Sequence, residues 1–354
     1  MIIHNNILEL VGNTPLIKLN KSVSNFQGNY YAKWEGFNPG HSNKDRIALH
    51  IINEAEKKGL IKEGSTIIET TSGNTGFSLA MVSLVRGYKC VLAVSSKSSE
   101  DKINMLQSMG AKIYVCPSNV EPEDPRSYYE VAKKINLETP NSLYVNQYFN
   151  TLNTLAHYNS TGPEIWKQTG GKITHLIGSS GTGGTLSGSA KFLKEKNKKI
   201  KIIGVDAYGS VLKKYHETGK LDKNEIYPYN IEGLGKNLIP LATDFSVIDK
   251  FIKVTDKSSA ISSRLVTKKE GIFVGYTSGA VYQAIVQLND ESYFNRESNI
   301  VLIFPDQPLT FSVFSAAISQ FTLSCFLACI TCHVDSPTIT AISLNESVSS
   351  PRFT

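Results

Sequence analysis

The chain has 354 residues, of which 41% are hydrophobic and 19% charged, with a formal net charge of +6. This length suits two α/β domains of ordinary size, and the composition is that of a globular protein without bias towards disorder. The lysines are scattered or stand in short runs such as residues 194–201, which argues against a nucleic-acid-binding surface. Five cysteines do not form a disulfide framework, so we expect Cys90 and Cys116 to be buried thiols.

Short β-branched runs alternate with helical patterns from residue 7 to about residue 305. In chain order, the pattern predicts strands at 66–69, 89–94, 112–116, 174–177, 201–205 and 299–304. It predicts helices at 44–58, 75–86, 102–109, 128–135 and 185–196, and an exposed loop at 116–126, where three prolines stand. Strands that alternate with helices favour parallel sheets covered on both faces, that is, an α/β fold.

Four turns marked by glycine or asparagine stand where predicted helices begin. The first, at residues 38–43, places Lys44 in the first turn of a helix. The helix dipole disfavours a cation there and lowers the pKa of an amine, which suits a nucleophile or a base. The alternative is a surface lysine that pairs with Asp45 or Glu35.

The second turn, residues 69–76, follows a strand and gathers hydroxyl and amide side chains at a helix N-terminus. It suits an anion of carboxylate size, although a simple capped turn would look similar. The third, residues 178–185, has the glycines and threonines of a phosphate cradle. It lacks the lysine of a nucleotide P-loop, and no acidic ribose partner follows it. The fourth, residues 275–280, is by itself a weak signal.

A reactive lysine, a carboxylate turn and a phosphate cradle together meet the needs of a pyridoxal-phosphate enzyme that acts on an amino acid. In this order the motifs resemble the cysteine synthase and cystathionine β-synthase family of fold type II pyridoxal-phosphate enzymes. The resemblance runs from Val11-Gly12-Asn13-Thr14-Pro15-Leu16 to Phe304-Pro305-Asp306. It implies two three-layer α/β domains with mostly parallel sheets, as in the tryptophan synthase β subunit. Residues 1–45 and 151–306 would form the larger, phosphate-binding domain and residues 46–150 the smaller, carboxylate-binding one.

The resemblance also implies pyridoxal 5'-phosphate as cofactor, a homodimer, and no metal. Lys44 would carry the cofactor, and Asn74 would contact its ring oxygen. The other cofactor-binding residues would be Gly181, Thr182, Gly183, Gly184 and Thr185 at the phosphate and Thr277 at the pyridine nitrogen. The residues that bind the substrate carboxylate would be Thr71, Ser72, Asn74, Thr75 and Gln147, and the remaining substrate-binding residues would be Tyr148, Glu232 and Gly233.

A hydroxyl such as that of Thr277 is too weak an acid to protonate the pyridine nitrogen fully. The ring is then a weaker electron sink, which favours loss of a β-substituent over transamination. Lys44, once released by the substrate, would take the Cα proton as general base, and a thiol or sulfide would add at Cβ. We therefore expect β-replacement on L-serine or O-acetyl-L-serine with a sulfur nucleophile.

Two residues favour a cystathionine β-synthase over a cysteine synthase. Cysteine synthases usually carry phenylalanine at Tyr148 and tend to carry glutamine at Glu232, whose carboxylate could meet the amino group of homocysteine. The alternatives are a cysteine synthase that uses O-acetylserine and sulfide, a non-catalytic binding protein on the same fold, and a serine or threonine dehydratase. Three departures from the family pattern are Asn43 in place of the usual valine, Ser179-Ser180 before the phosphate loop, and Thr277 where serine is commoner.

The tail, residues 307–354, has no glycine and no lysine and departs from the usual continuation after Asp306, as a shifted reading frame or an alternative exon would produce. Residues 309–332 are uncharged, but their serine, threonine and glutamine content argues against a membrane anchor. Cys329-Ile330-Thr331-Cys332-His333 matches a c-type haem pattern that we do not expect to be used, because no export signal is visible. The expected location is therefore the cytoplasm.

Overall fold

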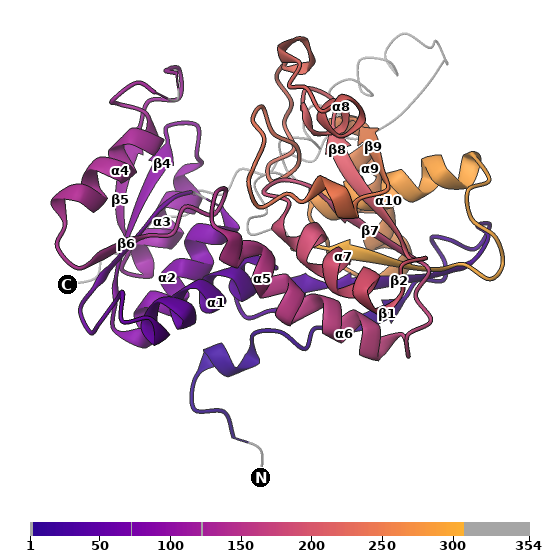
Figure 1. The fold of residues 1–354 in the computed structure, drawn as a ribbon, viewed down its shortest axis with the longest axis horizontal. Coiled ribbons are helices and arrows are strands. Elements are labelled where there is room, and N and C mark those ends of the chain that lie inside the picture. Colours follow the sequence, from indigo (N-terminus) through magenta and orange to yellow (C-terminus); the bar gives the residue numbers. More distant parts are fainter. Residues whose placement is uncertain (1–2, 72, 122, 308–354) are drawn as a thin grey trace, which may run out of the picture. The chain divides into compact units, whose positions relative to one another are not determined.

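Two separate sheets organise the chain (Figure 1), which a computed structural model describes for residues 3–71, 73–121 and 123–307. The larger sheet has the strand order β1-β2-β10-β7-β8-β9, and the smaller has the order β5-β4-β3-β6. Every neighbouring pair is parallel except β1 and β2. The strands of the larger sheet are β1 (Leu16–Lys18), β2 (Asn29–Trp34), β7 (His175–Ser179), β8 (Lys201–Ala207), β9 (Lys250–Val254) and β10 (Asn299–Phe304). Those of the smaller sheet are β3 (Thr66–Thr70), β4 (Lys89–Ser95), β5 (Lys112–Cys116) and β6 (Ser142–Tyr144).

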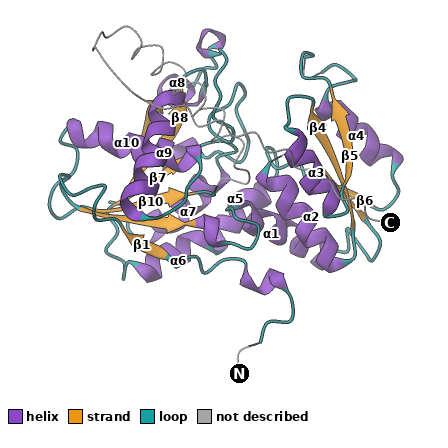
Figure 2. Ribbon diagram, turned by 180° about the vertical axis from the view of Figure 1, so that it is seen from behind, coloured by secondary structure: helices purple, strands orange, loops and turns teal. Residues whose placement is uncertain are grey.

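Helices cover the sheets, as the view from behind also shows (Figure 2). The α-helices of the described residues are α1 (Lys44–Lys57), α2 (Asn74–Arg86), α3 (Glu100–Ser108), α4 (Tyr128–Glu138), α5 (Thr151–Asn159), α6 (Thr161–Gln168), α7 (Gly184–Lys196), α8 (Leu212–Thr218), α9 (Asp256–Glu270) and α10 (Tyr276–Asp290). None of these helices is long and apolar enough to cross a membrane.

Strand β10 shows why the larger sheet needs helices on both faces. Its apolar residues alternate between two cores: Ile300 and Leu302 pack with residues of α9 and α10, whereas Val301 and Ile303 pack with residues of α6 and α7. In the smaller sheet, Ile67 likewise belongs to a core with α1 and α2, and its neighbour Ile68 to a core with α4. Successive side chains of a strand point to opposite faces, so a strand that is apolar throughout must be buried on both.

The predicted α/β fold with mostly parallel sheets is confirmed. Each predicted strand and helix is present, with ends shifted by a few residues at most, and Cys90 and Cys116 are buried thiols. The sequence pattern missed β1, β2, β6 and β9 and the helices α5, α6, α8 and α9, and it indicated α10 only through the turn at residues 275–280. Strand β2 is instructive, because Lys33 interrupts its apolar pattern and yet is fully buried. The predicted domain boundaries stay a prediction, and the tail motifs lie outside the described residues.

Candidate active site

The Lys44 amine lies at the start of α1, where sequence analysis expected it. Its Nζ donates a 2.8 Å hydrogen bond to Oδ1 of Asn43. Burial lowers the pKa of the amine to about 8, against the attraction of the nearby Asp306 carboxylate. An amine with this pKa is partly deprotonated near neutral pH, which a base or a nucleophile requires.

The alternative view of Lys44 as a paired surface lysine is wrong. The Asp45 carboxylate accepts hydrogen bonds from the Gly40 N–H and the Ser78 hydroxyl, both at 2.5 Å. Glu35 pairs with Arg46, whose Nε lies 2.6 Å from Oε2. Both acids are buried and bind other partners. Neither forms an ion pair with the Lys44 amine.

The predicted phosphate loop connects β7 to α7, and its glycines stand where neighbouring groups leave no room for a side chain. Gly183 has a φ of 84°, and a Cβ there would overlap Oγ1 of Thr243. A Cβ at Gly181 would overlap the carbonyl oxygen of Gly233. No N-cap side chain bonds the first turn of α7, so its N–H groups are available to an anion.

The residues around this loop fit a phosphate group. The buried Ser180 hydroxyl has no hydrogen-bond partner among the described residues, and it can donate to an anion. The Thr182 hydroxyl accepts a 3.1 Å bond from Nδ2 of Asn153. Thr185 Oγ1 accepts a 3.0 Å bond from Nδ2 of Asn43 and lies 3.1 Å from Nε2 of His157. In both threonines the hydroxyl hydrogen can therefore turn towards a ligand.

The predicted carboxylate turn joins β3 to α2. The Thr71 hydroxyl accepts a 3.2 Å bond from the Gly73 N–H, and the Thr75 hydroxyl donates a 2.8 Å bond to Oε1 of Gln147. No N-cap side chain bonds the first turn of α2. Its backbone N–H groups therefore suit an anion such as a substrate carboxylate. Ser72, predicted in the same turn, lies outside the described residues.

A carboxylate that sequence analysis did not assign stands among these side chains. Asp306 stands two residues after the end of β10. It accepts a 2.7 Å hydrogen bond from Nδ2 of Asn74 through one oxygen and a 3.1 Å bond from the Thr277 hydroxyl through the other. Burial raises the pKa of this carboxyl. A signal for it existed, because an acidic residue at the carboxyl end of a buried parallel strand stands where open α/β sheets bind ligands. The predicted residues Asn74 and Thr277 are thus brought together.

The three residues predicted on the substrate side lie in different surroundings. The Tyr148 hydroxyl is 3.3 Å from Nζ of Lys236, which also lies 4.8 Å from the centre of the tyrosine ring. Gly233 lies beside Gly181 in the phosphate loop. The Glu232 side chain is 76% exposed and pairs with Lys102 of α3, with Oε2 and Nζ 2.5 Å apart. Glu232 therefore faces solvent and a lysine of a different segment.

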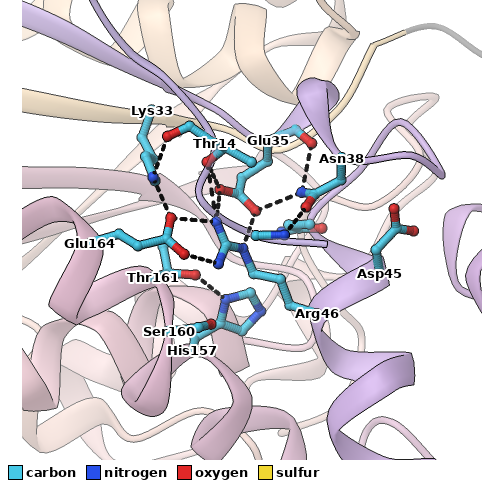
Figure 3. A network of polar contacts seen from close by, with 12 residues as sticks. Thr14, Lys33, Glu35, Asn38, Asp45, Arg46, His157, Ser160, Thr161 and Glu164 are labelled. Atoms are coloured by element: carbon cyan, nitrogen blue, oxygen red, sulfur yellow. Dashed lines mark hydrogen bonds and ion pairs between the residues drawn. The ribbon is translucent and has the colours of Figure 1, made fainter. Parts of the chain in front are cut away.

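A buried ion network surrounds the side chain of Arg46, a residue of α1 (Figure 3). Arg46 donates to Glu35 and to both oxygens of Glu164, at 2.6 to 2.8 Å. The same Glu164 pairs with Lys33 of β2 at 2.5 Å. Burial acts to raise the pKa of Glu35, but the attraction and hydrogen bonds of Arg46, together with Lys33 and the Thr14 hydroxyl, lower it to about 2. This network ties α1, which carries Lys44, to β2 and α6.

Comparison with known proteins identifies relatives over most of the chain. Residues 7–306 match the family described as "Pyridoxal-phosphate dependent enzyme". Cystathionine beta-synthase of Apis mellifera is 45% identical over 302 residues, which cover 85% of this chain and 59% of that protein. Cysteine synthase 1 of Emericella nidulans is 35% identical over 305 residues, which cover 85% of this chain and 82% of that protein. The chain spans little more than half the length of the cystathionine beta-synthases it matches.

Among solved structures, a hydrogen sulfide-producing enzyme from Fusobacterium nucleatum is similar in fold and sequence. The TM-score is 0.80 at 34% sequence identity, and the alignment covers 87% of this chain and 98% of that one. The match extends over both sheets, because it reaches most of the described residues.

Proposed function

Because the chain belongs to the family of pyridoxal-phosphate dependent enzymes, in the group of cystathionine beta-synthases and cysteine synthases, we propose that it catalyses β-replacement with a sulfur nucleophile. The amino-acid donor is L-serine or O-acetyl-L-serine. The nucleophile is homocysteine, and the product is cystathionine.

One observation carries the proposal: the Lys44 amine and the phosphate loop share a bonding partner. Asn43 accepts a hydrogen bond from Nζ of Lys44 and donates one to Thr185. When bound, pyridoxal phosphate supplies a conjugated electron sink for the substrate's Cα. With a pKa of about 8, the Lys44 amine can accept the Cα proton near neutral pH. The carboxylate turn at the start of α2 then holds the substrate in place.

The other predicted contacts complete this proposal. In this proposal Asn74 contacts the ring oxygen of the cofactor, and Thr277 contacts the pyridine nitrogen. Asp306 orients both side chains by accepting a hydrogen bond from each. Hydrogen bonds from Asn74 and Thr277 to Asp306 support this arrangement, because they bring the two side chains to one carboxylate. We further propose that residues 1–45 and 151–306 form one domain and residues 46–150 another, and that the protein acts as a cytoplasmic homodimer.

The negative charge of Glu232, which acts on the Asp306 carboxylate of the site, favours homocysteine over sulfide. Glu232 is exposed and pairs only weakly with Lys102, since an exposed ion pair contributes at most about 1 kcal/mol. The α-ammonium group of homocysteine can replace the lysine as the partner of Glu232 with little loss of free energy. Sulfide has no positively charged group that could pair with a carboxylate. The higher identity to a cystathionine beta-synthase than to a cysteine synthase agrees with this choice.

Product analysis tests the proposal. The purified protein, supplied with pyridoxal 5'-phosphate, is incubated with L-serine and homocysteine and, separately, with O-acetyl-L-serine and sulfide, and the products are identified by mass spectrometry. We expect cystathionine to form at the higher kcat/KM. Cysteine as the sole product would establish the cysteine synthase alternative. Pyruvate without a thiol would indicate a dehydratase, and no turnover at all would indicate a binding protein.

A further inference from the structure

The side chain of Asn43 makes two bonds that its position in the helix does not require. It is 3% exposed and stands at the N-cap of α1, yet it makes no capping bond to that helix. Instead, Oδ1 accepts from Nζ of Lys44 at 2.8 Å, and Nδ2 donates to Oγ1 of Thr185 at 3.0 Å. Valine, which is usual at this position in the resembling family, could make neither bond.

The donor and acceptor roles along this chain of bonds are fixed by chemistry. A lysine ammonium can only donate, so the amide oxygen of Asn43 must face Lys44 and the NH₂ group must face Thr185. The Thr185 oxygen is then an acceptor for that NH₂ group, and its own hydrogen can go to His157 or to a phosphate oxygen. Burial lowers the pKa of His157 to about 3, so the ring is neutral and adds no charge beside the loop.

We propose that Asn43 is a positioning residue that couples the Lys44 amine to the bound phosphate. Its carbonyl oxygen stabilises the protonated amine after Lys44 takes up a proton, and its NH₂ group turns the Thr185 hydroxyl towards the phosphate. The inference rests on the proposed function, because only there does Lys44 act as a base beside a bound phosphate.

Other charged groups near the Lys44 amine also affect its pKa, and their effects do not depend on Asn43. Asp306, after β10, and Glu35, before α1, favour the charged amine, and Lys236 disfavours it. His157 of α5 faces the loop as a neutral ring. All four groups remain in place when Asn43 alone is changed. A shift in the pKa of Lys44 in such a variant therefore reports the contact with Asn43.

Two variants of opposite effect test the inference, with a matched control. Asn43→Val removes both bonds, whereas Asn43→Asp keeps an acceptor for Lys44 and adds a negative charge but loses the donor to Thr185. Asn53→Val makes the same change further along α1, where Asn53 accepts a 3.2 Å bond from Arg86 at the surface.

The readout is the rate at which the cofactor-free, full-length chain captures pyridoxal 5'-phosphate, followed by absorbance as a function of pH. Only the deprotonated amine attacks an aldehyde, so the midpoint of the profile reports the pKa of Lys44. We expect Asn43→Val to lower the midpoint by about one unit, the equivalent of one charge-assisted hydrogen bond. Asn43→Asp should raise it by about one unit. Asn53→Val should match the wild type.

Inorganic phosphate serves as a competitor in the same assay and tests the second bond. Both Asn43 variants should bind it about fivefold more weakly, as expected for the loss of one hydrogen bond. Midpoints that stay at the wild-type value, or that move in the same direction in both variants, would overturn the inference, as would unchanged phosphate affinity. If one variant does not fold, the direction in which the other variant shifts the pH midpoint still tests the inference. Opposite shifts in a chain that catalyses no replacement would retain the Asn43–Lys44 coupling but refute the proposed function.

Discussion

The side-chain amide of Asn74 donates a 2.7 Å hydrogen bond to the carboxylate of Asp306, 232 residues away in the chain. The other oxygen of that carboxylate accepts a bond from Thr277. One acidic side chain after β10 thus joins the first turns of α2 and α10. Helix α2 follows β3 of the smaller sheet and α10 precedes β10 of the larger sheet, so Asp306 connects the two sides of the site.

Asp306→Ala is expected to weaken cofactor binding. The variant leaves Asn74 and Thr277 without their shared acceptor and removes an opposite charge near Lys44. The dissociation constant for pyridoxal 5'-phosphate, measured by titration of the bound chromophore, should rise by about tenfold. Asp290→Ala, an exposed position at the end of α10, serves as control. Equal affinity in both variants would show that Asp306 does not organise the site.

Arg46→Met should strongly destabilise the fold. Its guanidinium is buried between Glu35 and Glu164, and removal of one partner leaves uncompensated buried charge. We expect a loss of about 3 to 5 kcal/mol in the free energy of unfolding, measured with urea. Arg86→Met breaks the exposed pair with Glu56 and should cost about 1 kcal/mol or less. Similar losses in the two variants would contradict the importance of the buried network.

Gly183→Ala should abolish cofactor binding while a matched glycine tolerates the same change. Gly183 and Gly59 both have positive φ, at 84° and 66°. A Cβ at Gly183 would overlap Thr243, whereas a Cβ at Gly59 would meet nothing within 4 Å. The backbone strain is thus common to the two variants, and only Gly183→Ala deforms the phosphate loop. The test compares cofactor retention after gel filtration, and retention by Gly183→Ala would refute the assignment of the loop.

Glu232→Gln should separate the two candidate nucleophiles. We expect the KM for homocysteine to rise by up to about fivefold, because the variant loses an attraction for the α-ammonium group that is worth at most about 1 kcal/mol at this exposed position. The KM for sulfide should not change. Lys102→Met removes the present partner of Glu232 and should leave the KM for homocysteine unchanged or lower it. An equal effect of Glu232→Gln on both nucleophiles would argue against its contact with homocysteine.

The sequence pattern predicted the buried parallel strands well. Short runs that are apolar on both faces and that stand between helical segments are typical of strands in a parallel sheet covered by helices. It failed at β2, where burial of Lys33 is compensated by Glu164 from a helix distant in sequence. No local pattern shows that a lysine will find such a partner, since the pairing depends on tertiary structure.

The sequence predicted the separate motifs of the site. It did not predict the hydrogen bonds that join residues of different motifs. Glycine and threonine runs at helix starts identified the phosphate loop and the carboxylate turn by local chemistry alone. Asn43 was noted only as a departure and Asp306 only as the end of a motif. Their roles arise from contacts with Thr185, Asn74 and Thr277, which the sequence places far away.

The visible absorption spectrum of the purified protein tests the central claim most directly, recorded before and after addition of L-serine and then O-acetyl-L-serine. We predict a yellow protein with a visible band that shifts when either amino acid is added, and that is missing in a Lys44→Ala variant. The amino acid that produces the shift at the lower concentration is the preferred donor. A wild-type protein that stays colourless when pyridoxal 5'-phosphate is added would contradict the assignment of Lys44 and of the phosphate loop.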